Sequence, residues 1–400
     1  MRHAAAGETA AFLDTFEAAW GFDLGAAERR HIGADVAQES ALVACAGGAV
    51  AGTAMSFALE LTVPGLSRLP MAGVSYVAVH PLRRRRGLLR ALMRFQLDDL
   101  HERGVPVAGL GASEAGIYGR FGYGPATWVS SWQLPRGAAR GLTDRDDRTR
   151  LELVDAATAR ELLPAMHEQA RRRQLGDVRT YPGRWHDLIG DDSGHGKHFL
   201  LCLDDHDRAS GYAIYRIDRE KRYSAQATVT VEHLISCTDG AYLSLWAYLA
   251  DLDLTDWLVA NGRPEHEPLQ WALADSRQLE VTSRSDHLWV RLIDVPAALA
   301  GRRYAADGSV VLEVTDPFCP WNEGHWLLEG GPDGATCRRA VPQDGPRVSL
   351  DAGALGSLFL GGPSVAHLAT AGRIRGDHSS LRRASQVFGA GLNPWSSTEF

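Results

Sequence analysis

The sequence predicts a mixed α/β fold made of three successive units. Strand-like apolar runs alternate with stretches of helical periodicity along the whole chain. A charged segment without such periodicity interrupts them, and units of roughly 100 to 150 residues match the usual size of a domain. With 42 basic residues, 49 acidic residues and 45% hydrophobic residues, the chain is neither disordered nor collagen-like, and it is not a disulfide scaffold.

The first unit is expected to open with two helices and a hairpin. Residues 8–20 and 25–36 have the periodicity of short amphipathic helices. Residues 40–59 carry no charged side chain and are long enough to cross a bilayer. They consist mainly of Ala, Gly and small polar residues, however, and Gly47-Gly48 lies at their centre. We therefore expect two strands joined by a tight turn.

A strand, a basic turn and a helix follow at 72–79, 80–86 and 87–103. The helix is indicated by residues at helical spacing, namely Leu89, Leu92, Met93, Gln96, Leu97 and Leu100. The remaining elements of this unit are expected to be a strand at 105–110, a short helix at 113–121 and a last strand at 126–134.

The rest of the chain is expected to form two further units. The charged run at 136–150 has no apolar periodicity and predicts a linker. The second unit is expected to contain helices at 157–173 and 240–252, with strands at 198–203, 211–217 and 225–235. The third is expected to open with a strand from Leu288 and a helix from Pro296, followed by short strands and two terminal helical stretches. We set the domains at 1–140, 141–287 and 288–400.

The turn before Gly87 is the strongest candidate for a binding site. A helix N-terminus presents unpaired N–H groups and a partial positive charge, and glycine allows a phosphate to approach the backbone. Four consecutive arginines, Arg83, Arg84, Arg85 and Arg86, add positive charge. Such a run can equally be a solvated turn or a nucleic-acid patch, but its position between a strand and an amphipathic helix favours a pyrophosphate site. The Walker and Rossmann glycine motifs are absent from the sequence.

Several segments resemble a known family. The sequence VAVHPLRRRRGLLRAL (residues 77–92) resembles the acyl-CoA loop of GNAT-fold N-acetyltransferases. ASEAGIYGRFGYGPAT (residues 112–127) resembles the Eis (enhanced intracellular survival) family of bacterial aminoglycoside and lysine N-acetyltransferases. VPAALAGRRY (295–304), LGSLFLGG (355–362) and the terminal Glu399-Phe400 extend the resemblance over the whole chain. The loop departs from the general [RQ]xxGx[GA] pattern, because Leu89 stands at the small-residue position.

The resemblance implies an α/β (α+β) protein of two tandem GNAT-like domains and a C-terminal sterol-carrier-like domain, assembled as a homohexamer. The first domain would be catalytic and the second would lack a working site. The co-substrate would be acetyl-CoA, and no metal is expected. The implied coenzyme contacts are Val77, Ala78, Val79, Arg85, Arg86, Gly87, Leu88, Leu89, Arg90, Ser113 and Glu114. Strand residues suit this role because the amide-rich pantetheine can pair with a strand edge.

The resemblance also assigns the proton transfers. Tyr118 would donate a proton to the departing thiolate, with Tyr123, five residues on, as its rival. The α-carboxylate of the terminal Phe400 would accept the proton of the amine. A chain end is frayed by default, but an aromatic last residue can anchor the tail in a pocket. Tyr76 and Glu399 are candidates for shaping the amine pocket.

Three other features of the sequence do not indicate a functional site. In the second unit, Asp239 stands at the helix start where the first unit has arginines, so it would cap the helix but repel a pyrophosphate. His195, His198 and His206 lie in a loop that is more typical of solvated histidines than of a metal site. No GxSxG elbow supports a hydrolase.

Charge and cysteine usage bear on partners and location. The net charge of −7 gives no reason to expect nucleic acid and suits a cationic partner. Glu8, Asp14 and Glu17 do not fit a secretory signal, and we expect no membrane span. The cysteines are odd in number, far apart and without CxxC spacing, which favours a reducing cytoplasm; they are Cys45, Cys202, Cys237, Cys319 and Cys337.

The combined prediction is an acetyl-CoA-dependent N-acetyltransferase. It would acetylate primary amines of aminoglycosides or lysine side chains by direct transfer, without a covalent enzyme intermediate. The alternative is a protein that binds lipids or small molecules through its third domain, with the other two domains as scaffold.

Overall fold

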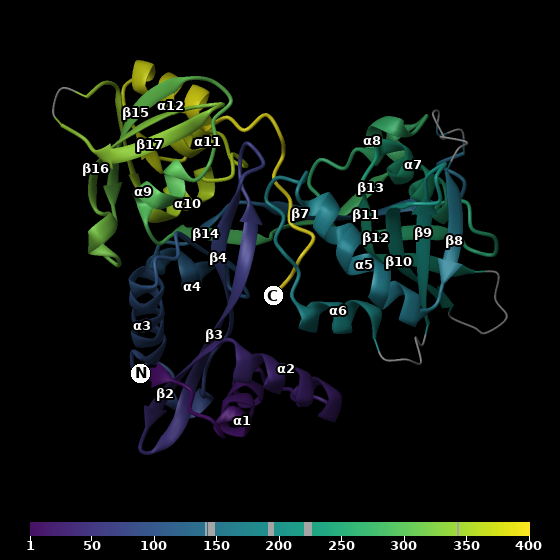
Figure 1. Cartoon of the computed structure of the whole chain (residues 1–400), viewed down its shortest axis with the longest axis horizontal. Helices are drawn as coiled ribbons and strands as arrows, with labels where there is room; N and C mark the ends of the chain where they lie inside the picture. The colour runs from purple at the N-terminus through teal and green to yellow at the C-terminus, as the bar shows by residue number, and fades with distance from the viewer. Residues whose placement is uncertain (141, 143–148, 191–195, 220–225, 342–343) are drawn as a thin grey trace. The chain divides into compact units, whose positions relative to one another are not determined.

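The computed structural model describes residues 1–400 except 141, 143–148, 191–195, 220–225 and 342–343. Its contacts divide the chain into two compact units (Figure 1). The first unit comprises Met1–Thr127, His287–Pro394 and Phe400. The second unit comprises Trp128–Asp286 and Trp395–Glu399.

The first unit opens as the sequence predicts. Helices α1 (Thr9–Trp20) and α2 (Ala26–Gln38) precede an antiparallel hairpin of β2 (Ser40–Ala46) and β3 (Ala49–Thr62). Gly47 and Gly48 have φ of 65° and 81°. Two consecutive positive φ values define the type I′ turn that joins strands most tightly, so the hairpin prediction is confirmed.

The first sheet is mixed and has the strand order β1-β2-β3-β4-β5-β14-β6. Helix α3 (Leu88–Glu102) packs on β2, β3 and β4 through the apolar face that the sequence predicts, and the buried Gln96 amide donates to Ser56 Oγ at 2.7 Å. The short helices η1 (Pro81–Arg83), α4 (Ala115–Tyr118) and η2 (Gly119–Phe121) complete this region. The strands not yet bounded are β1 (Arg2–His3), β4 (Arg68–Val79), β5 (Val107–Gly111), β6 (Gly124–Pro125) and β14 (Leu288–Leu292).

Two strands exchange places between the sheets relative to the sequence prediction. We expected the strand at 126–134 to close the first unit, but β7 (Trp128–Pro135) pairs with β12 (Trp257–Pro264) and β13 (Glu280–Asp286) of the second sheet. Strand β14, expected to open the third unit, pairs with β5 and β6 instead. An alternating apolar pattern indicates a strand but not its partner, which is why the sequence did not reveal this exchange.

The second unit is built on a sheet of order β13-β7-β12-β11-β10-β9-β8. Three of its strands, β8, β12 and β13, were not predicted. The predicted linker at 136–150 lies partly outside the described residues; its described residues, 136–140, 142, 149 and 150, belong to this unit, and Ala139 and Leu142 are buried in its core. The further elements are β8 (Arg150–Val154), α5 (Ala156–Arg171), α6 (Pro182–Ile189), β9 (Lys197–Leu203), β10 (Ala209–Arg219), β11 (Ala227–Ser236), α7 (Asp239–Leu249), α8 (Leu269–Ala272) and η3 (Ser276–Gln278).

Residues after β14 build a five-stranded sheet within the first unit, in the order β17-β16-β15-β18-β19. Helix α10 (Ala352–Leu358) packs directly on β14, because Gly356 allows a backbone approach: a Cβ there would lie 2.1 Å from Val290 O. The remaining elements are α9 (Val295–Ala300), β15 (Gly308–Thr315), η4 (Pro320–Asn322), β16 (Gly324–Gly331), β17 (Gly334–Arg339), β18 (Arg347–Asp351), α11 (Val365–Thr370), β19 (Ile374–Arg375) and α12 (His378–Phe388).

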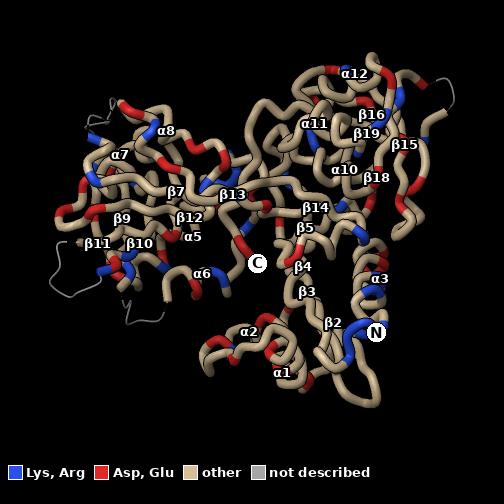
Figure 2. Tube along the Cα trace, turned by 180° about the vertical axis from the view of Figure 1, so that it is seen from behind, with Lys and Arg blue, Asp and Glu red and all other residues tan. Residues whose placement is uncertain are grey.

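The mixed α/β class is confirmed, whereas the domain boundaries after residues 140 and 287 stay a prediction. Helix α3 carries charges of both signs, as Figure 2 shows, with Arg90 and Arg94 in its first half and Asp98, Asp99 and Glu102 in its second half. Among the described residues, no helix combines the length and the apolar character needed to cross a membrane.

Candidate active site

Strand β4 separates from its neighbour β5 at the candidate site. The two strands pair in parallel from Met71↔Val107 to Gly73↔Gly109, and no later β4 residue in the described chain pairs with β5. The register between β4 and β3 shifts next to Tyr76, whose φ is 51°, and Thr53 Oγ1 donates to Tyr76 O at 2.8 Å. This bulge bends β4, so that the edge formed by Val77, Ala78 and Val79 faces a cavity.

The N-terminus of α3 opens onto the same cavity. Its N-cap is Gly87, with φ of 78°, and no side chain caps the first N–H groups of the helix. A Cβ on Gly87 would meet no atom within 4 Å, so the space in front of these groups is open. Unpaired N–H groups and the helix dipole stabilise an anion, and Arg84, Arg85 and Arg90 add positive charge around the cavity. These residues fit a pyrophosphate.

The cavity has a volume of about 650 Å³, which is within the usual range for small-molecule sites. It gathers all of the implied coenzyme contacts except Arg86, which is exposed and outside the lining. Leu88 and Leu89 also pack on the hydrophobic core, which confirms their expected core role, while their contact with the coenzyme stays a prediction. Five lining residues were not predicted: Ala19, Trp20, Ile117, Arg120 and Phe121. Arg84, which belongs to the predicted basic turn, also lines the cavity.

Some of these missed residues had a signal in the sequence. Ile117 and Arg120 lie in the IYGRFGY motif that carries Tyr118. This motif forms the short helices α4 and η2, which line the cavity on one side. Trp20 comes from the end of α1, far away in the sequence, and only the folded chain brings it here.

The two candidate proton donors differ in their access to the cavity. Tyr118 lines it and is 7% exposed, whereas Tyr123 is not in the lining and is 1% exposed. Their rings lie 6.2 Å apart in an edge-to-face arrangement. Burial, and next the nearby Glu114 carboxylate, raises the pKa of Tyr118, so its phenol keeps its proton at neutral pH. The Tyr123 hydroxyl is buried and has no hydrogen-bond partner among the described residues.

The remaining predicted residues lie outside the cavity lining. The Phe400 ring packs beside Gly73, the last β4 residue paired with β5: a Cβ on Gly73 would lie 2.9 Å from Phe400 Cδ2. The Tyr76 ring packs against Phe12, Phe16 and Phe57.

Glu399, the other candidate for the amine pocket, is exposed. It forms an ion pair with Arg184 in the second unit at 3.2 Å.

In the second unit, the N-terminus of α7 corresponds to that of α3 but has an acidic residue in place of the arginines. Thr238, not Asp239, is the N-cap of α7, because its side chain accepts from Ala241 N; Asp239 lies in the first turn. The described residues contain no group of three or more His, Cys, Asp or Glu side chains that could hold a metal ion. His195 lies outside the described residues, while His198 stacks on Tyr215.

Family models match three segments of the chain. Residues 1–126 match an acetyltransferase (GNAT) domain, residues 178–292 match another acetyltransferase (GNAT) domain, and residues 295–397 match a sterol carrier protein domain. The first match contains the whole cavity lining.

Whole-chain comparisons find named relatives. An N-acetyltransferase of Streptomyces coelicolor is 38% identical over 355 residues, covering 87% of this chain and 85% of the relative. The N-acetyltransferase Eis of Mycobacterium tuberculosis is 37% identical over 367 residues, covering 88% and 87%. The crystal structure of Eis1 from Mycobacterium abscessus, 35% identical, superposes with a TM-score of 0.88 over 100% of this chain and 99% of that one.

Proposed function

This chain belongs to the Eis family of GNAT N-acetyltransferases, and on that premise we propose that it acetylates a primary amine of an aminoglycoside or of a lysine side chain. Acetyltransferases of the GNAT type use acetyl-CoA, and Eis-type enzymes act on amines. The single observation that carries the proposal is the cavity in which the free edge of β4, the uncapped N-terminus of α3 and Tyr118 meet.

The residues around the cavity suit the binding of acetyl-CoA. The N–H groups at the start of α3 and the guanidinium groups of Arg85 and Arg90 would hold the pyrophosphate. The edge of β4 from Val77 to Val79 would pair with the amides of pantetheine as an added strand does. When bound, acetyl-CoA supplies a thioester, whose carbonyl carbon is the electrophile.

Two groups of this chain would move the protons. The Phe400 carboxylate accepts a proton from the ammonium substrate through water, which frees the nitrogen lone pair for attack. The amine nitrogen then forms a bond to the acetyl carbon and the C–S bond breaks. Tyr118, which lines the cavity, donates its phenolic proton to the departing thiolate.

A C-terminal extension tests the proposal. Adding Gly-Ser after Phe400 converts the terminal carboxylate into an amide, which cannot accept the proton. We expect the extended protein to lose turnover. Turnover is measured as the release of free thiol with a panel of aminoglycosides or lysine peptides as acceptors. Acetyl-CoA should still bind and raise the melting temperature, because ligand binding to the native state stabilises it. Full activity of the extended protein would refute the role of Phe400.

The alternative of a lipid-binding protein with inactive GNAT units is not favoured, because the whole-length relatives are named N-acetyltransferases. Two further features stay predictions. A homohexamer is proposed from the family resemblance, and sedimentation of the full chain tests it. A cytoplasmic location is proposed from the cysteine pattern, and no disulfide joins any of the five cysteines, all of which are among the described residues.

A further inference from the structure

The end of the chain is buried in the second unit rather than frayed. Residues 395–398 are buried, although they lie within six residues of the C-terminus. The Trp395 backbone N–H donates to Leu175 O at 2.8 Å, and its indole Nε1 donates to Gly262 O at 2.9 Å. Thr398 Oγ1 donates to Val178 O at 3.0 Å. Backbone and side-chain groups of the tail are therefore held at fixed positions.

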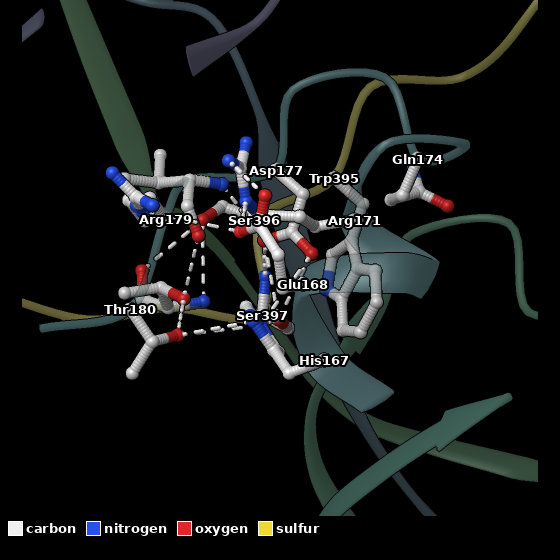
Figure 3. Close-up of polar contacts among 12 residues, drawn as sticks. His167, Glu168, Arg171, Gln174, Asp177, Arg179, Thr180, Trp395, Ser396 and Ser397 are labelled. Atoms are coloured by element: carbon white, nitrogen blue, oxygen red, sulfur yellow. Dashed lines mark hydrogen bonds and ion pairs between the residues drawn. The ribbon is translucent and has the colours of Figure 1, made fainter. Parts of the chain in front are cut away.

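The strongest contacts of the tail are made by Ser397 (Figure 3). Asp177, 1% exposed, accepts from the Ser397 backbone N–H at 2.8 Å and lies with both carboxylate oxygens 3.1 Å from Ser397 Oγ. His167 Nε2 lies 2.9 Å from the same hydroxyl. A buried carboxylate needs such donors, and the tail supplies them to Asp177 in addition to the Val178 N–H.

This cluster is not a hydrolase site, although it contains Ser, His and Asp. The carboxylate contacts the serine directly instead of orienting the distal nitrogen of the imidazole, and His167 is 2% exposed. No substrate can reach a hydroxyl that is already bonded on both sides, so the arrangement binds and does not react.

The tail occupies the opening between two diverging strands. Strands β11 and β12 pair in parallel from Thr228↔Trp257 to Val231↔Ala260 and pair no further in the described chain. Just beyond this point, His233 Nε2 lies 3.3 Å from Ser397 O, and Gly262 O accepts the indole of Trp395. The first unit opens in the same way where β4 leaves β5. In the second unit the peptide fills this opening only in part, because a cavity of about 420 Å³ lined by Asp177, Thr238 and Trp395 remains beside the tail.

We propose that the second unit is a peptide clamp in which Asp177 and His167 act as positioning residues for the C-terminal carboxylate. Ser397 lies three residues before the end, and three residues span at most about 11 Å. Fixing Ser397 therefore confines Phe400 to that distance. The functional part of this inference rests on the proposed role of Phe400 as proton acceptor.

Carboxypeptidase digestion of the folded full-length protein tests the clamp without using activity. We expect Asp177→Asn and Ser397→Ala each to release Phe400 about tenfold faster than the wild type, since each weakens charge-assisted hydrogen bonds that keep the tail closed. Asp253→Asn and Ser283→Ala are matched controls at exposed positions of the second unit, and both should release Phe400 at the wild-type rate. Melting temperatures identify any variant that merely unfolds.

Steady-state kinetics of the same variants test the positioning role. We expect kcat to fall by about tenfold to 10²-fold, with an unchanged KM for acetyl-CoA, because the carboxylate is misplaced while the coenzyme cavity is intact. Unchanged release of Phe400 from both variants would overturn the clamp. Faster release with unchanged kcat, while deletion of Phe400 abolishes turnover, would overturn the positioning role alone. If deletion of Phe400 leaves turnover intact, the proposed function of Phe400 fails, and the release rates still decide whether the clamp exists.

Discussion

The ring of Phe400 packs beside Gly73, at the last residue pair that joins β4 to β5. A Cβ on Gly73 would lie 2.9 Å from Phe400 Cδ2 and 2.4 Å from Leu59 Cδ1, distances too short for carbon atoms. The Phe400 ring therefore has a defined packing position, which depends on the absence of a side chain at Gly73.

Gly73→Ala is expected to displace Phe400 and to lower kcat. Overpacking of this kind typically costs about 1–3 kcal/mol of folding stability. The matched control is Gly111→Ala at the end of β5, where a Cβ meets no atom within 4 Å. Steady-state kinetics and urea unfolding of both variants check the prediction, and equal kcat values for Gly73→Ala and the wild type would contradict it.

The two tyrosines should respond in opposite ways to loss of the hydroxyl. Tyr118→Phe is expected to lower the acetylation rate by about 10² to 10⁴, the usual effect of losing one proton-transfer partner. Tyr123→Phe should leave the rate unchanged and stabilise the fold by about 1 kcal/mol, because it removes a buried hydroxyl without a hydrogen-bond partner among the described residues. Kinetics and urea unfolding measure both effects. A large rate loss in Tyr123→Phe with none in Tyr118→Phe would reverse the assignment.

Gly87→Ala should weaken acetyl-CoA binding beyond its effect on stability. A left-handed backbone costs an alanine about 1–2 kcal/mol, and the new Cβ would project into the space in front of the α3 N-terminus. Gly104→Ala, after the C-terminus of the same helix, has a similar φ of 70° and equally open surroundings. Both variants should lose similar stability, but calorimetry should find a Kd raised about tenfold only for Gly87→Ala. Equal Kd values in the two variants would argue against a phosphate at Gly87.

Stability should fall in mildly acidic solution because of His167 and His233. Burial lowers the pKa of both imidazoles below the ordinary value of about 6.5. In mildly acidic solution, these two histidines therefore bind protons in the unfolded chain but not in the native state. The stabilisation is complete above about pH 6.5 and is lost as the pH falls toward the lowered pKa values that the two histidines have in the folded state.

Urea unfolding at about pH 7.5 and about pH 5.5 measures this effect, since most carboxylates stay ionised over that range. We expect a lower midpoint at the acidic pH and a smaller difference in His233→Gln, whose side chain does not titrate. A midpoint independent of pH in the wild type would show that these histidines are protonated in the native state.

Local patterns predicted the elements of the candidate site well. The basic turn and the amphipathic α3 follow from residue spacing, and the cavity contains all but one of the implied coenzyme contacts. Pairing partners could not be predicted, since the alternating pattern of β7 is satisfied equally by either sheet. Anchoring of the tail by its aromatic last residue was considered, but the burial of residues 395–398 was not predicted. Ser397 looks like a solvent-exposed residue in sequence, and only the fold brings Asp177, 220 positions earlier, to meet it.

The exchange of β7 and β14 limits how the chain can be shortened. A fragment ending after residue 135 would carry β7 without the strands that flank it in the second sheet, and would leave β5 and β6 without the strand between them. Such a piece would expose unpaired strand edges, which recruit other chains and precipitate. Expressing residues 1–135 alone should therefore yield insoluble material.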